Sequence, residues 1–318
     1  MPAISSSACG KFILTGEHAV VYGEPAIALP LTSRRIHLRV EASIMGQAGE
    51  ISVAFPALGL DSKLDHLPDK HPIYRAIIET LNRLGINQRP SCKLHYNTQL
   101  PIGAGLGSSA AMAVATIRGL SSFLGHPLDD SAINQLAYEC EKTVHDNPSG
   151  IDNTVITYER PVFFQKGKEI AFLQPKKAFH FILADSGVQK STHESVAQLA
   201  AFREAKPAFV LPRITEIGEL SQMAQNALLS GDEAELALAI NRNQVLLSEL
   251  ELSCPELDRL ISLAQDSGAL AAKLTGGGKG GYLIALVEAE KANLVWEKMT
   301  EQGAINAFQT VVEPLVSK

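Results

Sequence analysis

The stretch Pro101-Ile102-Gly103-Ala104-Gly105-Leu106-Gly107-Ser108-Ser109-Ala110-Ala111 is a glycine-dense turn that runs directly into a small, apolar, helix-forming segment, Met112 to Leu124. Glycine lets the backbone bend with its N–H groups pointing outward, and the positive end of a helix dipole follows at once. This arrangement predicts a binding site for a phosphate group. A tight strand-to-helix connection without a ligand is the alternative for one such turn, because glycine is common in any strained turn.

The spacing of this loop matches neither of two widespread nucleotide-binding motifs. A Walker A loop needs Gly-Lys followed by Ser or Thr, whereas Gly278-Lys279 is followed by Gly280. A dinucleotide-binding loop needs Gly-x-Gly-x-x-Gly, whereas the glycines of the 101–111 stretch alternate and are followed by Ser108. Both motifs are excluded by spacing.

Length and charge limit the class of protein. The chain has 318 residues, of which 46% are hydrophobic, which is enough to build two ordinary domains. Its formal net charge is −6 and no run of lysine or arginine exceeds two residues, so we expect no nucleic-acid or membrane-surface partner. The first residues lack the profile of a signal peptide, and no apolar run reaches the roughly 18 to 20 residues of a membrane span. A cytoplasmic protein is expected.

The cysteines are Cys9, Cys92, Cys140 and Cys254, which lie far apart and form no Cys-x-x-Cys pair. This spacing indicates neither a zinc site nor a disulfide framework. We expect them to be reduced thiols, most of them buried in the core.

Hydrophobic periodicity predicts an α+β protein. Apolar patterns predict strands at 7–14, 26–31, 36–42 and 93–96, with helices at 71–84 and, capped by Ser131, at 131–143. An irregular polar turn is predicted at 145–153. The composition changes after 166–168, and the second half is predicted to contain a strand at 179–184, helices at 192–204, 211–229, 232–249 and 255–267, a second glycine-rich turn at 273–281 and a strand at 282–287. Mixed sheets packed against helices are expected in both halves.

Candidate catalytic side chains lie in or beside irregular backbone. They are Lys11, Glu17-His18, Ser108-Ser109, Glu141 and Asp152. Phosphoryl transfer needs a phosphate cradle, oxygen ligands for Mg²⁺, a carboxylate for the attacking hydroxyl and a cation for developing charge, and these residue types supply that set. Each residue alone has an ordinary alternative: a solvated lysine, a turn histidine, an exposed helix charge, an Asx turn or a helix cap. Their combination favours a kinase.

Three motifs give the sequence a resemblance to the GHMP kinases, the family of small-molecule kinases that includes galactokinase, homoserine kinase, mevalonate kinase and phosphomevalonate kinase. The motifs are Gly10-Lys11 followed by Glu17-His18, the loop from Pro101 to Ala110, and Leu274-Thr275-Gly276-Gly277-Gly278. They are spread over residues 8–282, nearly the whole chain. Within the family, Gly16 to Gly23 and Asn147 to Asn153 resemble the mevalonate kinase branch.

The resemblance implies a fold and a catalytic set. Residues 1–176 would form a domain similar to the second domain of ribosomal protein S5, and residues 177–318 would form a ferredoxin-like domain, with ATP and substrate bound between the two. Asp152 would be the catalytic carboxylate and Lys11 the lysine beside it. Ser109 and Glu141 would be the ligands of Mg²⁺, the metal cofactor.

The resemblance also implies two groups of binding residues. The substrate would be bound by Glu17, His18, Val21 and Thr192. The nucleotide would be bound by Pro101, Gly103, Ala104, Gly105, Leu106, Gly107, Ser108, Ser109, Ala110, Gly276, Gly277 and Gly278. Three positions depart from the family pattern, namely Cys9 in place of Pro, Asp146 in place of Gly and Lys279 in place of Gly, and none of them is an assigned catalytic position.

The implied activity is ATP-dependent phosphorylation of (R)-mevalonate to 5-phosphomevalonate, a step of isoprenoid biosynthesis. Two alternatives stay open: another kinase of the family, such as a phosphomevalonate kinase or a sugar kinase, and a non-catalytic nucleotide-binding regulator on the same fold. The sequence itself does not determine the oligomeric state; dimers are common in families of this kind, so a homodimer is one expectation.

Overall fold

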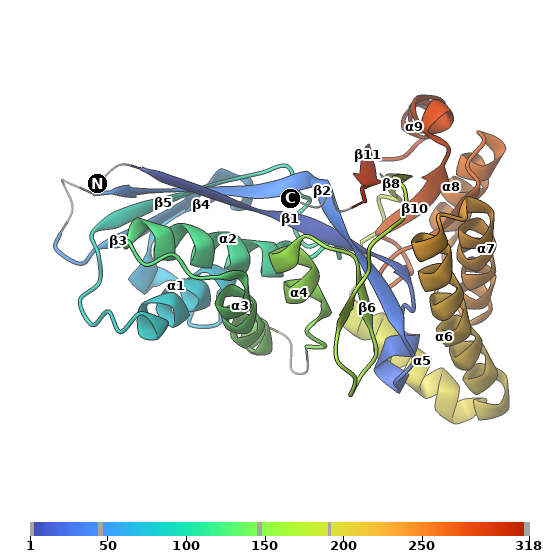
Figure 1. Ribbon diagram of the computed structural model, residues 1–318, viewed down its shortest axis with the longest axis horizontal. Helices are drawn as coiled ribbons and strands as arrows, with labels where there is room; N and C mark the ends of the chain where they lie inside the picture. The colour runs from blue at the N-terminus through green and yellow to red at the C-terminus, as the bar shows by residue number, and fades with distance from the viewer. Residues whose placement is uncertain (1–2, 44–46, 145–147, 190–191, 315–318) are drawn as a thin grey trace. The chain divides into compact units, whose positions relative to one another are not determined.

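The computed structural model, drawn in Figure 1, describes residues 3–43, 47–144, 148–189 and 192–314, apart from the side chains of Val144, Thr192 and His193. Contacts within the chain divide it into two compact units. The first contains Met1–Lys11 and Arg34–Glu159, and the second contains Phe12–Ser33 and Arg160–Lys318. Strands β1 (Ile4–Thr15) and β2 (Ala26–Ala42) each contribute residues to both units. The domain boundary expected at residue 176 stays a prediction.

The first unit is a sheet covered by helices. Its strands follow the order β4 (Leu60–Lys63), β3 (Ile51–Phe55), β5 (Cys92–Thr98) and β2, and β1 pairs with β2. β5 runs antiparallel to β2 and parallel to β3. The helices α1 (Pro72–Arg83), α2 (Ser108–Phe123), α3 (Asp130–Val144) and α4 (Ile151–Tyr158) lie along one face of this sheet (Figure 1). Two short 3-10 helices, η2 (Pro56–Leu58) and η3 (Leu64–His66), flank β4.

The residues of β5 explain why one face of the sheet is covered. Cys92, Leu94 and Tyr96 are buried and alternate with less buried residues, the pattern of a strand with one packed face. The Tyr96 ring stacks on Phe55 of β3 with 5.2 Å between centroids, and its hydroxyl lies 2.7 Å from Oγ1 of Thr116 on α2. The packed face of the sheet therefore fixes α2, whose first residues belong to the glycine-rich loop.

The second unit is built on a sheet with the strand order β11 (Ala307–Val312), β8 (Phe179–Asp185), β10 (Tyr282–Val287) and β9 (Ala271–Leu274), and each neighbouring pair is antiparallel. Helices α5 (Thr192–Ala205), α6 (Pro207–Ser230), α7 (Glu233–Glu249) and α8 (Pro255–Asp266) lie between β8 and β9 in the chain, and α9 (Ala292–Glu301) lies between β10 and β11. This βαββαβ succession is that of a ferredoxin-like fold, as expected. The unit also contains β6 (Val162–Phe164), β7 (Ala171–Phe172), η1 (Ala19–Tyr22) and η4 (Ala289–Lys291).

The α+β class and most predicted elements are confirmed, because their hydrophobic patterns are long and regular. All six residues of β10 are buried, and α1, α5, α6, α7 and α8 lie where the periodicity placed them. Cys9, Cys92 and Cys140 are free and buried, whereas Cys254 is partly exposed. The likeness of the first unit to the ribosomal protein domain stays a prediction.

Four local predictions were wrong. The strands expected at 26–31 and 36–42 form one strand, β2, which continues through the polar residues 32–35 between them. Asp129 rather than Ser131 caps α3: its Oδ1 accepts a hydrogen bond from the Ala132 N–H at 2.8 Å. Lys11, expected in or beside irregular backbone, lies inside β1. The irregular segment expected to continue to residue 153 ends earlier, since α4 begins at Ile151.

Candidate active site

The glycine-rich loop leads into α2 with a backbone conformation that suits anion binding. Gly103, Gly105 and Gly107 have φ angles of 72°, 75° and 79°, the left-handed region that residues with side chains disfavour. Gly107 is the N-cap of α2 and offers no side chain to cap the helix. The hydroxyl of Ser108 accepts a hydrogen bond from the Gly103 N–H at 3.2 Å, which closes the loop on itself. The N–H groups of the first helical turn lack intrahelical partners, and this geometry suits a phosphate.

Strand β1 approaches this loop closely. The Lys11 N–H donates a hydrogen bond to the Leu106 carbonyl at 2.9 Å. A Cβ atom at Gly10 would lie 2.9 Å from the same carbonyl oxygen. A Cβ atom at Gly107 would lie 2.9 Å from Cγ of Lys11 and 2.8 Å from Cδ1 of Ile156. Glycine at both positions therefore permits the lysine to lie against the loop.

The structure brings the predicted catalytic pair together. Nζ of Lys11 lies 3.2 Å from Oδ1 of Asp152, which stands in the first turn of α4. The lysine side chain retains 9% of its exposure and the aspartate 35%. The ammonium group is thus held inside the unit, while the carboxylate can be reached from outside it.

The predicted magnesium ligands also meet. The Ser109 hydroxyl, on the first turn of α2, donates a hydrogen bond to Oε1 of Glu141 on α3 at 2.9 Å. Glu141 is buried. Two oxygen atoms from different helices therefore lie side by side at the start of α2, the helix that follows the glycine-rich loop.

Polar contacts between α3 and α4 hold the aspartate helix in place. Nδ2 of Asn153 donates to Oδ1 of Asn134 at 2.6 Å, and the Thr154 hydroxyl donates to the Gly150 carbonyl at 2.7 Å. Gly150 is the N-cap of α4 with a φ angle of 84°, which a larger residue would adopt only with strain. The start of α4, and with it Asp152, is fixed by its own helix and by α3.

In the second unit, His18 contacts the late glycine-rich loop. Its Nε2 lies 2.9 Å from the Gly277 carbonyl oxygen, so this nitrogen carries the hydrogen and Nδ1 is an acceptor when the ring is neutral. Burial lowers the pKa of His18, and the Lys273 charge lowers it further, against the opposing effect of the Gly277 carbonyl. His18 has a left-handed φ of 60°, which fixes the turn between β1 and η1.

Glu17 forms an ion pair with Lys273, a residue of β9. Both side chains are almost fully buried, with 1% and 0% exposure, and Nζ of Lys273 also donates to the Leu274 carbonyl at 2.6 Å. Burial lowers the pKa of Lys273, while Glu17 acts in the opposite direction. Sequence reasoning gave Lys273 no role. The sequence analysis placed Lys273 at the start of a glycine-rich turn, whereas it lies in β9 after the apolar residues Ala271 and Ala272.

The late loop is tied to β1 and packs closely on its surroundings. The Thr275 hydroxyl donates to the Ile13 carbonyl at 2.9 Å and accepts from the Ile13 N–H at 3.0 Å. A Cβ atom at Gly278 would lie 2.2 Å from the Leu252 carbonyl oxygen, so only glycine fits there. Lys279, with a left-handed φ of 59°, donates its N–H to the same carbonyl at 2.7 Å.

The structure gives little information on the roles predicted for Val21, Thr192 and Asp146. Val21 lies on η1 with 51% exposure. Thr192 is the first residue of α5, but its side chain lies outside the described residues, as does Asp146 entirely. Their expected roles stay predictions.

Comparison with known proteins identifies the family. The GHMP kinases N terminal domain matches residues 71–160, and the GHMP kinases C terminal domain matches residues 224–305. The chain is 32% identical to a mevalonate kinase of Thermococcus gammatolerans over 92% of this chain and 91% of the relative. It is 34% identical to a mevalonate kinase of Archaeoglobus fulgidus, over 90% and 93% of the two chains.

The chain belongs to the mevalonate kinase branch of the GHMP kinases. Solved structures agree: the L. major mevalonate kinase in complex with R-mevalonate superposes with a TM-score of 0.84 at 25% identity, covering 98% of this chain and 97% of that one. The Methanococcus jannaschii mevalonate kinase gives a TM-score of 0.81 at 26% identity, with coverage of 99% and 98%. The predicted fold, two domains of the GHMP kinase type, is thereby confirmed.

Proposed function

We propose that this enzyme transfers the γ-phosphoryl group of ATP to the primary hydroxyl of (R)-mevalonate, giving 5-phosphomevalonate and ADP. The main support for the proposal is the ion pair of Lys11 and Asp152. Within the same unit, Lys11 lies against the glycine-rich loop that we assign to the phosphates. Its kinship with the mevalonate kinases supports the substrate.

The roles of the residues follow from their geometry. The loop from Gly103 to Gly107 and the start of α2 bind the phosphates of ATP through backbone N–H groups. Asp152 orients the attacking hydroxyl and accepts its proton, and Lys11 stabilises the negative charge on the transferred group. Phosphoryl transfer has a loose transition state, so positioning and charge matter more than the strength of the base.

The residues present fit a magnesium ion. The Ser109 and Glu141 oxygens lie 2.9 Å apart, close to the roughly 3 Å expected between neighbouring ligands of an octahedral ion with bonds of about 2.0–2.1 Å. In the described parts of the chain, no group of three or more His, Cys, Asp and Glu side chains could hold a metal, which agrees with an ion bound largely by phosphates and water. Mg²⁺ would neutralise phosphate charge there.

Substrate recognition is assigned to the second unit. Mevalonate carries a carboxylate and two hydroxyl groups, and the neutral His18 ring offers an acceptor nitrogen to such a hydroxyl. Glu17, Val21 and Thr192 complete the proposed set, and Gly276, Gly277 and Gly278 are assigned to the nucleotide.

None of the described helices is long and apolar enough to cross a membrane. A cytoplasmic location and a homodimer belong to the same proposal.

Release of ADP in the presence of Mg²⁺ tests the function. Mevalonate, 5-phosphomevalonate, galactose and homoserine are compared at equal concentrations, and mevalonate should give the highest kcat/KM. A faster reaction with another acceptor overturns the substrate but not the kinase. No ADP release with any of them, together with ATP binding, indicates a nucleotide-binding regulator.

A further inference from the structure

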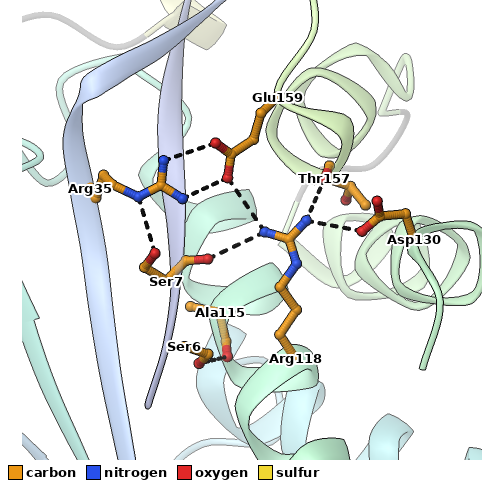
Figure 2. A network of polar contacts seen from close by, with 8 residues as sticks. All are labelled: Ser6, Ser7, Arg35, Ala115, Arg118, Asp130, Thr157 and Glu159. Carbon is orange, nitrogen blue, oxygen red and sulfur yellow. Dashed lines mark hydrogen bonds and ion pairs between the residues drawn. The ribbon is translucent and has the colours of Figure 1, made fainter. Parts of the chain in front are cut away.

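A polar network in the first unit joins the strand that carries Lys11 to the helix that carries Asp152 (Figure 2). Arg118 of α2 lies at its centre. Its guanidinium donates to the Ser7 carbonyl on β1 at 3.2 Å and to the Thr157 carbonyl in the last turn of α4. It also pairs with Asp130, the first residue of α3, at 3.1 Å. Carbonyl groups in the last turn of a helix lack intrahelical partners, so the arginine completes the end of α4.

A second arginine, Arg35, also links β1 to the end of α4. Arg35 of β2 holds the carboxylate of Glu159 in a bidentate pair, with N–O distances of 2.6 and 2.9 Å, and its Nε donates to the Ser7 hydroxyl at 3.0 Å. Arg118 lies 3.6 Å from the same carboxylate. Glu159 is the C-cap of α4 with a left-handed φ of 52°, a conformation that non-glycine residues adopt only when their surroundings fix it.

The network and the catalytic pair link the same two elements at different points. Ser7 precedes Lys11 by four residues on β1, about 13 Å along the strand and on the same face. Glu159 follows Asp152 by seven residues, about 10 Å along α4. Strand and helix are therefore cross-linked once by Lys11 and Asp152 and once by the two arginines. A rotation or shift of α4 about the catalytic end is blocked at its other end.

We propose that Arg118, with Arg35 and Glu159, is a positioning residue for phosphoryl transfer, which holds α4 against β1 so that the Asp152 carboxylate stays beside Lys11. The inference rests on the proposed function of that pair. Arg118 joins four elements because its planar fork presents several donors at fixed angles, which a lysine ammonium cannot reproduce. Arg118 is the one charged residue of α2 (Ser108–Phe123), and the sequence analysis gave it no role.

Kinetics of Arg118→Lys test the proposal, with KM values for mevalonate and MgATP measured beside kcat and the thermal midpoint. We expect kcat to fall roughly 10- to 100-fold, because small misplacements of reacting groups have effects of this size, while both KM values stay near wild type. Glu159→Gln, which keeps the shape of the side chain, should lower kcat in the same way. Arg213→Lys is the matched control: Arg213 donates to Glu249 at 2.6 Å and to the Phe209 carbonyl at 2.8 Å in the other unit, and kcat should not change.

A double-mutant cycle distinguishes a positioning role of Arg118 from a role in the stability of the protein alone. In the Arg118→Lys background, the loss caused by Asp152→Asn should be about tenfold smaller than in wild type, because the carboxylate is already displaced. The proposal is overturned if the two substitutions lower kcat independently, so that their effects multiply. It is also overturned if kcat is unchanged in Arg118→Lys and Glu159→Gln, or if the unfolded fraction of the protein explains the loss. A wild-type enzyme that prefers another acceptor overturns only the proposed substrate, and the cycle is then measured with that acceptor.

Discussion

Lys11 and Asp152 are joined at 3.2 Å, but the lysine is nearly buried whereas the aspartate keeps a third of its side-chain exposure. The buried partner cannot move far, because its backbone is bonded to Leu106 and its side chain lies against Gly107. A fixed cation beside an accessible carboxylate is suited to orienting an incoming hydroxyl group.

Replacement of the carboxylate should leave a folded protein with little turnover. For Asp152→Asn we expect kcat to fall roughly 10²- to 10⁴-fold, the range for loss of a positioned proton acceptor, with ATP binding retained. Steady-state kinetics and ATP titration by calorimetry measure the two properties. Near-normal turnover would remove Asp152 from the mechanism.

Two glycines of the phosphate loop should respond differently to alanine. Both Gly105 and Gly107 have left-handed φ angles, so either substitution strains the loop. A Cβ atom at Gly105 meets open space, whereas one at Gly107 meets the Lys11 and Ile156 side chains. Gly105→Ala should therefore act mainly on the KM for ATP, and Gly107→Ala should also lower kcat by displacing Lys11. Equal kcat values in the two variants would contradict this account.

Removal of a proposed magnesium ligand should be compensated in part by the metal itself. In Glu141→Gln a charged oxygen is lost, so activity should require a higher Mg²⁺ concentration than in wild type. Ser109→Ala should also weaken the use of MgATP. Activity is titrated with Mg²⁺ at constant ATP, and superimposable curves for Glu141→Gln and wild type would show that the residue is structural.

The sequence indicated the candidate residues of both pairs in the first unit, because glycine loops and polar motifs are local signals. Lys11, Ser109, Glu141 and Asp152 were each chosen beside an irregular segment, and the structure brings them together in pairs. Glu141 and Asp152 lie on α3 and α4, whose packing places them, and no local pattern gives such a distance.

What the sequence could not predict depends on contacts between distant segments. The burial of Lys273 follows from its place in β9 between β10 and the helices, and its partner Glu17 lies far away in the chain. The network around Arg118 draws on β1, β2, α2, α3 and α4 at once. The short strands β3 and β4 were missed, because a pattern of five or four residues is too short to distinguish a strand from a loop.

Removal of one partner of the buried Glu17–Lys273 ion pair should destabilise the protein strongly. Lys273→Met should lower the free energy of unfolding by about 3–5 kcal/mol, because the Glu17 carboxylate is left buried without its cation. The double variant Lys273→Met with Glu17→Gln should recover part of this loss. Chemical denaturation of the three proteins provides the values, and a double variant no more stable than Lys273→Met would contradict the coupling.

Replacement of His18 tests the proposed substrate site. His18→Leu should raise the KM for mevalonate much more than the KM for ATP, since a site built around a polar group loses heavily when that group is absent. Because His18 also donates to the Gly277 carbonyl, a second outcome has a clear meaning. Equal increases of both KM values would indicate that His18 mainly supports the late loop.

The same histidine should make stability depend on pH. Its pKa in the folded protein lies below the ordinary value of 6.5, so the unfolded chain takes up a proton first as the pH falls. The stabilisation that comes from neutral His18 is therefore present above pH 6.5 and is lost progressively below it. Thermal midpoints measured from pH 8 to pH 5 should decrease more steeply for wild type than for His18→Gln, and His126→Gln, at an exposed position, should follow wild type. Parallel curves for wild type and His18→Gln would show that His18 is not held in the neutral form.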